Sequence, residues 1–174
     1  MTELPVDFSA FHQLNRATYI RYAETILNNR ADAEEAVDTC FEKLLRCWEA
    51  VLSKENPAGY AWRVLRNCTL DACTARARRP VPFDTAAFHT EALLSAVDPV
   101  GQLEESLNLF HHIRMLPPRQ MDVILLLHAH GMTTHKVAEH LGITAASVRS
   151  NARHAVRRLR ELLHLDNDTE GTAG

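Results

Sequence analysis

The sequence predicts an all-α protein made of two small helical domains joined by a flexible linker. Apolar residues recur at three- and four-residue steps over most of the 174 residues, which is the spacing of one helix face. A stretch of prolines and acidic residues, 80–102, interrupts that spacing, as a linker does. With 46% hydrophobic and 24% charged residues, the composition is that of a globular protein. We therefore predict a first domain at 1–79, a linker at 80–102, a second domain at 103–165 and a disordered tail at 166–174.

The first two predicted helices lie at the start of the first domain. Apolar and aromatic residues at helical steps predict one helix from Asp7 to about Asn29. Asp32 is the expected cap of the second helix, with Glu35 three positions later as in a capping box. A wide apolar stripe predicts that this second helix continues to Val51.

The third predicted helix begins at Asn56-Pro57, a capping residue followed by proline at the first helical position. It runs to about Arg79 and ends before Pro80, where the linker begins. These helices together would make one small bundle.

The second domain ends in a helix-turn-helix pattern. An apolar face between Leu103 and Leu116 precedes a helix that starts at Pro117-Pro118 and stops at Gly131. Thr133 or Thr134 would cap a short helix, Gly142-Ile143 would make a tight turn, and Thr144 would cap a helix from Ala145 to about Leu163. A short helix, a glycine turn and a long basic helix occur in the order of a helix-turn-helix motif.

Charge is distributed unevenly along the chain, although the formal net charge is only -3. Residues 60–79 carry five basic and one acidic side chain, and residues 107–164 carry eight and three. Between them, residues 80–106 carry five acidic side chains and no basic one. Two basic segments on either side of an acidic one indicate either two nucleic-acid contacts or two solvated helix faces.

The long basic helix favours DNA binding. A helix fits the major groove, where its first residues reach base edges and later arginines meet phosphates. The alternative is an arginine-rich face exposed to solvent, but the turn Leu141-Gly142-Ile143-Thr144 before the helix favours the motif. The residues expected to contact this upstream DNA are Thr144, Ala145, Ser147, Arg149, Ser150, Arg153 and Arg157.

The same region resembles a known family. Leu116-Pro117-Pro118-Arg119-Gln120, the run from His135 to Thr144, and Ser147-Val148-Arg149-Ser150 are similar to region four of bacterial sigma factors, above all of the extracytoplasmic-function group. The resemblance implies that this segment reads the upstream (minus-thirty-five) promoter element and touches the flap of the RNA polymerase beta subunit. Asn151 and His154 stand where the family commonly has arginine.

The first domain carries an independent resemblance to region two of the same family. The run from Asp32 to Asp38, leading to Phe41, resembles the helix that docks on the beta-prime clamp of the polymerase. The run from Tyr60 to Asn67, followed by Asp71, resembles the segment that recognises and melts the downstream (minus-ten) element. The two resemblances cover roughly residues 8–79 and 103–163.

The resemblance implies roles for two further sets of residues. The expected polymerase contacts are Glu35, Asp38, Phe41, Glu42 and Leu45. Melted bases need cations for their phosphates and aromatic or amide groups for the bases. For Tyr60 and Trp62, core packing is an equally good explanation. The expected downstream DNA contacts are Lys54, Asn56, Tyr60, Trp62, Arg63, Arg66, Asn67 and Asp71.

These observations predict a sigma factor that binds core RNA polymerase and promoter DNA, with an anti-sigma factor as a further expected partner. The alternative is a stand-alone helix-turn-helix regulator whose N-terminal bundle senses a ligand or dimerises. We expect no enzyme, no cofactor and no metal site, because no nucleophile–base pair is recognisable and the histidines and cysteines lack ligand spacing. Without a long apolar run or a basic leader, we expect a cytoplasmic protein with no membrane insertion.

Overall fold

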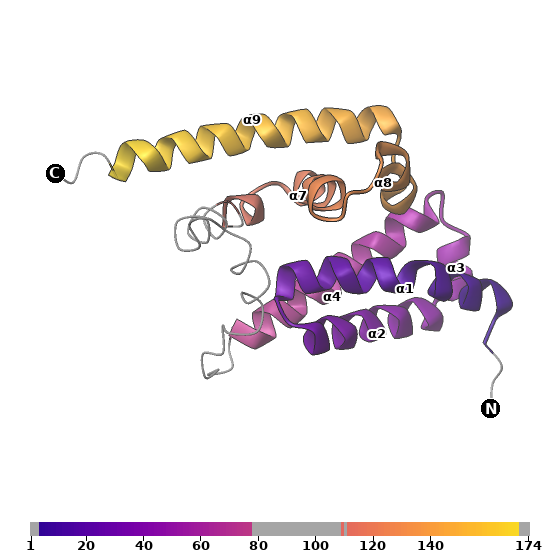
Figure 1. Cartoon of the computed structure of the whole chain (residues 1–174). Coiled ribbons are helices and arrows are strands. Elements are labelled where there is room, and N and C mark those ends of the chain that lie inside the picture. The colour runs from indigo at the N-terminus through magenta and orange to yellow at the C-terminus, as the bar shows by residue number, and fades with distance from the viewer. Residues whose placement is uncertain (1–3, 78–108, 110, 171–174) are drawn as a thin grey trace. The chain divides into compact units, whose positions relative to one another are not determined.

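The computed structural model describes residues 4–77, 109 and 111–170, with side chains in the last helix described up to Leu163. Every regular element in that part of the chain is a helix, which confirms the predicted all-α class. The described helices fall into two groups along the chain, a first unit over residues 4–77 and a second unit over residues 109–170, coloured indigo to magenta and orange to yellow in Figure 1. The predicted linker and residues 103–108 lie outside the described residues. None of the described helices is long and apolar enough to cross a membrane.

The first unit begins with α1, which spans Val6–Leu27. The predicted helix is confirmed, with an end slightly earlier than expected. It ends because Asn28 takes a left-handed backbone conformation with φ of 52°, which asparagine adopts more readily than most residues. The Asn28 N–H still donates to the Glu24 carbonyl oxygen at 2.8 Å, so the last turn of the helix is closed.

The second helix, α2, spans Arg30–Arg46 and runs back along α1 (Figure 1). Its cap is Asn29, whose side-chain oxygen accepts a hydrogen bond from the Asp32 N–H at 2.9 Å. The prediction that Asp32 caps this helix was therefore wrong. Asn29 has an extended backbone and satisfies an N–H that the helix itself leaves unpaired. Asp32 lies in the first turn, where a negative charge is favourable.

The helix does not continue to Val51, as the apolar stripe predicted. A turn at Cys47 separates α2 from α3, which spans Trp48–Leu52. The Trp48 ring packs at 5.1 Å from the Phe8 ring and 5.2 Å from the Phe11 ring, measured between centroids. The new direction of the chain is compatible with this aromatic contact, and tertiary packing here overrides the local periodicity.

The third long helix of the unit is α4, which spans Pro57–Ala77 and confirms the predicted start. The Asn56 side-chain oxygen accepts a hydrogen bond from the Gly59 N–H at 2.9 Å, as a capping residue does. At the other end, the Arg76 guanidinium donates to the Leu27 carbonyl oxygen at 2.6 Å and pairs with Asp32 at 3.3 Å. These bonds tie the end of α4 to the turn between α1 and α2.

Aromatic rings fill the core of the first unit. Tyr19 of α1 stacks on Phe41 of α2 at 5.4 Å, and Tyr22 of α1 lies 4.8 Å from Trp62 of α4. Removing one buried ring of this size costs about 3–5 kcal/mol of stability. The rings therefore hold the three long helices in fixed positions relative to one another.

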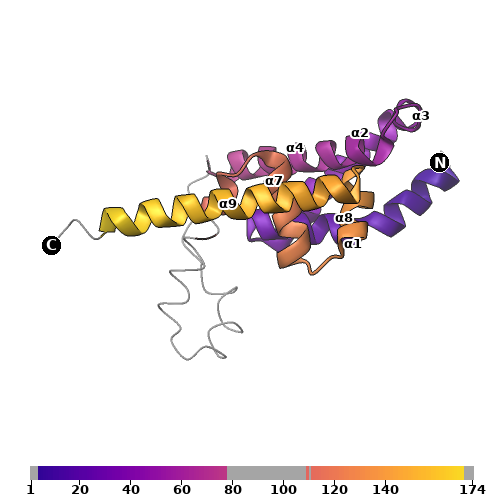
Figure 2. The same cartoon turned by 90° about the horizontal axis from the view of Figure 1, so that it is seen from above.

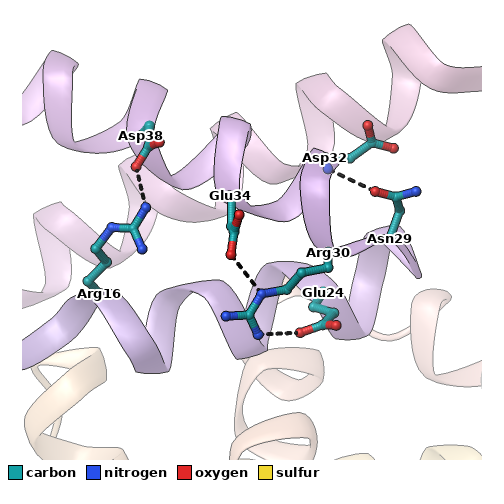
Figure 3. A network of polar contacts seen from close by, with 7 residues as sticks. All are labelled: Arg16, Glu24, Asn29, Arg30, Asp32, Glu34 and Asp38. Carbon is teal, nitrogen blue, oxygen red and sulfur yellow. Dashed lines mark hydrogen bonds and ion pairs between the residues drawn. The ribbon is translucent and has the colours of Figure 1, made fainter.

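Ion pairs lie along the exposed edges of α1 and α2, two of them between the helices and one within α2 (Figure 3). Arg16 pairs with Asp38 at 2.9 Å, and Arg30 pairs with Glu34 at 2.8 Å and with Glu24 at 3.2 Å. All five side chains keep contact with solvent, so these pairs add little to the stability of the fold. Their effect is to orient the charged side chains.

The second unit begins, within the described residues, with a helical segment at 111–114. After it come α7, which spans Pro118–Ile124, and η1, a π-helical continuation over Leu125–Ala129. The predicted start at Pro117-Pro118 is confirmed, with Pro118 at the first helical position. Residues 121–126 are all buried, so this helix forms the centre of the unit. Gly131 ends it with φ of 62°.

The helix-turn-helix motif follows as α8, which spans Thr134–Leu141, and α9, which spans Ala145–Glu170. Of the two predicted caps for α8, Thr133 fills the role, since its hydroxyl accepts from the Lys136 N–H at 3.3 Å. Gly142 has φ of 62°, a left-handed conformation that glycine adopts without strain. The sequence therefore identified both the turn and the helices on either side of it.

The last helix, α9, is longer than predicted. It passes the expected end near Leu163 and continues through residues 166–170, which the sequence assigned to a disordered tail. No glycine or proline interrupts the chain until Gly171, so nothing in the sequence stops the helix earlier. Figure 2 shows it as the long orange-to-yellow helix.

Candidate nucleic-acid interface

The first turn of α9 is capped by Thr144. Its hydroxyl oxygen accepts a hydrogen bond from the Ser147 N–H at 3.1 Å and lies 3.1 Å from the Ser147 hydroxyl. Asn151 turns inward along the helix, where its side-chain amide donates to the Ser147 carbonyl oxygen at 2.8 Å. Among the predicted contact residues, Thr144 is exposed and Ala145, Ser147 and Ser150 are half-buried. The predicted reading positions therefore keep access to solvent.

Beyond this turn, α9 carries an exposed arginine row, which we define as Arg149, Arg153, Arg157 and Arg160. At 3.6 residues per turn, these positions fall on one side of the helix. The opposite side carries Val148, Ala155 and Leu159, all buried. Burial of the apolar side fixes the rotation of the helix, so the arginine row must face solvent. A row of cations on an exposed helix is suited to DNA phosphates.

A second set of predicted contacts lies around the start of α4. Lys54 and Asn56 are exposed, and Tyr60 is half-buried. The Lys54 ammonium lies 4.6 Å from the centre of the Tyr60 ring, a cation–π contact that is worth about 0.5–1 kcal/mol at exposed sites. The contact holds a cation and an aromatic ring together. Proteins use these two kinds of group to bind the phosphates and bases of single-stranded nucleic acid.

Further along α4, Arg63, Asn67 and Asp71 are exposed and four residues apart, so they share one side of the helix. Arg66 is half-buried and already interacts with another group of the chain. Trp62 is only 2% exposed and packs against Tyr22. Of the two explanations that the sequence left open for Trp62, the structure shows core packing.

The predicted polymerase contacts also include both exposed residues and a residue that is buried in the core. Glu35, Asp38 and Glu42 are exposed on one side of α2, and we call them the acidic stripe. Leu45 is half-buried beside them. Phe41 is only 4% exposed and lies inside the aromatic core, out of reach of a partner. Its prediction as a direct contact is corrected: it supports the stripe from within.

The sequence did not identify Arg16 as part of this surface. Its guanidinium donates to the Asp38 carboxylate from the neighbouring helix (Figure 3). No local pattern could have found it, because the pairing depends on how α1 packs against α2. Asp38 therefore has a fixed orientation on the stripe.

Metal ligands do not gather anywhere in the described part of the chain: no group of three histidine, cysteine or acidic side chains is placed to hold an ion there. The four cysteines are free thiols.

Two family models match the chain. The model of sigma-70 region 2 matches residues 11–79, and that of sigma-70 region 4 matches residues 107–159. The first match contains α4 and the acidic stripe, and the second contains α8 and the start of α9. The order of the two matches is the order of the two units.

Curated relatives align over nearly the whole chain. The RNA polymerase sigma-E factors of Streptomyces avermitilis and Streptomyces coelicolor are each 27% identical over 160 residues, covering 91% of this chain and 86% of theirs. The ECF RNA polymerase sigma factor SigL of Mycobacterium tuberculosis is 29% identical over 155 residues, covering 87% of this chain and 85% of its own.

Proposed function

This chain belongs to the sigma-70 family, in its extracytoplasmic-function group, and we propose how its surfaces divide the work of transcription initiation. It binds core RNA polymerase and directs initiation at a subset of promoters, and it is not an enzyme. The alternative of a stand-alone regulator with a sensing or dimerising bundle is rejected, because that bundle is itself a sigma-70 region 2.

We assign upstream promoter recognition to α9. The observation that carries the proposal is the arginine row, which is exposed and opposite the buried side of the helix. Ala145, Ser147, Arg149 and Ser150 would meet base edges near the start of the helix, with Thr144 at its cap. Arg153 and Arg157 would meet phosphates, which fix the register of the helix in the groove.

We assign the melted downstream element to the surface around the start of α4. Lys54 and Tyr60 would hold an unstacked base and its phosphate through the cation and the ring, and Asn56 would add amide groups. Arg63, Asn67 and Asp71 would follow the strand along the exposed side of α4, with Arg66 adding charge behind them. Trp62 is excluded from this set because it lies in the core.

We assign clamp docking to the acidic stripe, with the half-buried Leu45 as its apolar neighbour. Exposed carboxylates with a defined orientation favour a basic partner surface and give specificity more than raw affinity. Contact with the polymerase flap from the second unit, an anti-sigma partner and a cytoplasmic location remain predictions from the family resemblance.

Run-off transcription with purified core polymerase tests the proposal. Arg149→Ala should lower transcription from a cognate promoter while leaving core binding, measured by fluorescence anisotropy, unchanged. Arg158→Ala is the matched control: it is also exposed on α9 but lies away from the arginine row, so it should affect transcription much less. Equal loss of core binding and transcription in Arg149→Ala would contradict the assignment.

For the acidic stripe we expect a loss of core polymerase binding, the property that Arg149→Ala should leave unchanged. Glu35→Ala and Glu42→Ala together should weaken core binding at unchanged fold, as judged by circular dichroism. If instead they leave core binding intact and change only promoter selection, the docking assignment is wrong.

A further inference from the structure

One exposed side chain of α9 is not used by the proposed function. His154 follows Arg153 directly and is exposed, as the arginine row is. At 3.6 residues per turn, it lies about 60° around the helix from Arg157 and about 40° from Ser150. His154 is therefore at the edge of the face that we assign to promoter DNA, one turn after a predicted base contact.

The His154 imidazole has no hydrogen bond, ion pair or ring contact with any residue in the part of the chain that the structure describes. Asn151, three residues earlier on the same helix, differs in this respect. Its side-chain amide donates to the Ser147 carbonyl oxygen at 2.8 Å, so that group is already engaged by the helix. The ring nitrogens of His154 are available to a ligand.

The charges around His154 are mostly positive. The charged residues of α9 within two turns of it are Arg149, Arg153, Arg157, Arg158, Arg160 and Glu161. The described helix with the most extensive contact to α9 is α7, whose charged residues are the exposed Arg119 and the fully buried Asp122. Neither of these two pairs with His154. Arginines nearby oppose a further positive charge on the ring, whereas a DNA phosphate placed beside it would favour that charge.

We propose that His154 is a further promoter contact, which donates a hydrogen bond to a DNA phosphate when its ring is protonated. The protonated imidazole has two N–H donors and a positive charge, and hydrogen bonds between ionised groups are roughly twice as strong as neutral ones. Phosphates border the major groove on both sides of a helix that lies in it, so a residue at the edge of the DNA-facing side can reach one. The inference deepens the assignment of α9 to upstream promoter DNA and rests on it.

The contact makes promoter binding depend on pH. Histidine is the side chain whose charge ordinarily changes between about pH 5 and 8, whereas arginine keeps its charge throughout. Because the phosphate favours the charged ring, His154 takes up a proton from solvent when the promoter binds. By linkage, the contact is present at the acidic end of this range and is lost as the pH rises. The arginine row supplies the constant part of the attraction, and His154 supplies the part that varies.

The experiment measures binding of labelled promoter DNA by the polymerase holoenzyme at about pH 6 and pH 8, the range in which histidine changes its charge, and at several salt concentrations. From the lower to the higher pH, the wild-type affinity should fall by about tenfold, the equivalent of one hydrogen bond to a charged group. The slope of log affinity against log salt should become shallower by about 1, as for one phosphate contact. His154→Gln should lack both changes, and His154→Arg should bind tightly, with the steeper slope, at either pH.

The matched control is His128→Gln, which removes another exposed histidine of the second unit and should keep the wild-type response to pH. A His154→Gln holoenzyme that keeps the same response would overturn the proposal. So would a wild-type salt slope that is equal at both pH values, because His154 would then not meet a phosphate. Arg153→Ala separates this failure from failure of the assignment of α9: if it weakens binding while His154→Gln responds to pH as the wild type does, only the role of His154 is wrong.

Discussion

The acidic stripe of α2 and the arginine row of α9 are both exposed charged faces, but they differ in how their charges are held. In the stripe, Asp38 pairs with Arg16 at 2.9 Å, and Glu42 lies 4.0 Å from Arg46. In the row, no described acidic side chain pairs with Arg149, Arg153 or Arg157. The first face is oriented by its own unit, and the second leaves its cations available to a partner.

The difference matches the partners that we propose. A protein surface presents its charges at fixed positions, so docking benefits from carboxylates that already have a fixed orientation. DNA phosphates form a regular array that is surrounded by condensed counterions. Binding is favoured when protein cations neutralise the phosphates and those counterions are released into solution. Arginines that have no partner within the protein are suited to this exchange. The chain therefore uses internal ion pairs where geometry matters and leaves them out where charge matters.

The largest expected effect concerns the core beneath the acidic stripe. Phe41→Ala removes a ring that stacks on Tyr19 and should destabilise the first unit by about 3–5 kcal/mol. Urea unfolding of the full chain, followed by circular dichroism, measures it. Glu42→Ala, one residue away and exposed, is the control and should change stability by less than about 0.5 kcal/mol. Similar values for both would mean that Phe41 is not part of the core.

The next largest effect concerns the arginine row and the salt dependence of promoter binding. Arg153→Ala should weaken promoter binding by the polymerase holoenzyme by about 1.5–3 kcal/mol, the value of a hydrogen bond to a charged group. It should also reduce the slope of log affinity against log salt by about 1. Titration of labelled promoter DNA at several salt concentrations provides both numbers. A lower affinity with the original slope would mean that Arg153 does not meet a phosphate.

A smaller effect is expected from removing the side chains that cap the starts of α2 and α9. Asn29→Ala and Thr144→Ala each remove a side-chain acceptor for a backbone N–H, so each should cost about 1 kcal/mol of stability. Thermal unfolding measures this cost. Only Thr144→Ala should also lower promoter binding, because α9 begins there. If Asn29→Ala lowers promoter binding as strongly, the loss in both variants follows from stability alone.

The smallest effect tests the orienting role of the internal ion pair. Arg16→Ala should change the free energy of unfolding by less than about 1 kcal/mol, because both side chains of the pair are partly exposed. Core polymerase binding should nevertheless weaken, since Asp38 loses its fixed orientation. Arg21→Ala, an exposed arginine also on α1, is the control for the loss of charge. If the two variants bind core polymerase equally well, the Arg16–Asp38 pair has no role in docking.

Local sequence signals accounted for much of the fold. The periodicity predicted α1, α4, α7 and α9, and the pairs Asn56-Pro57 and Pro117-Pro118 marked where two of them begin. The misses have a common origin in packing. The break at Cys47 accompanies the packing of Trp48 against the aromatic rings of α1, and the periodicity of one helix carries no information about that contact.

The candidate surfaces show the same division. The sequence by itself determined the helical class, the helix-turn-helix order, the uneven distribution of charge and the two family resemblances, because these depend on residues close together in the chain. Only the tertiary structure decided that Phe41 and Trp62 are buried and that Arg16 holds Asp38. Helical spacing defines which residues share a face, but the neighbouring helices determine which face is buried and what it touches.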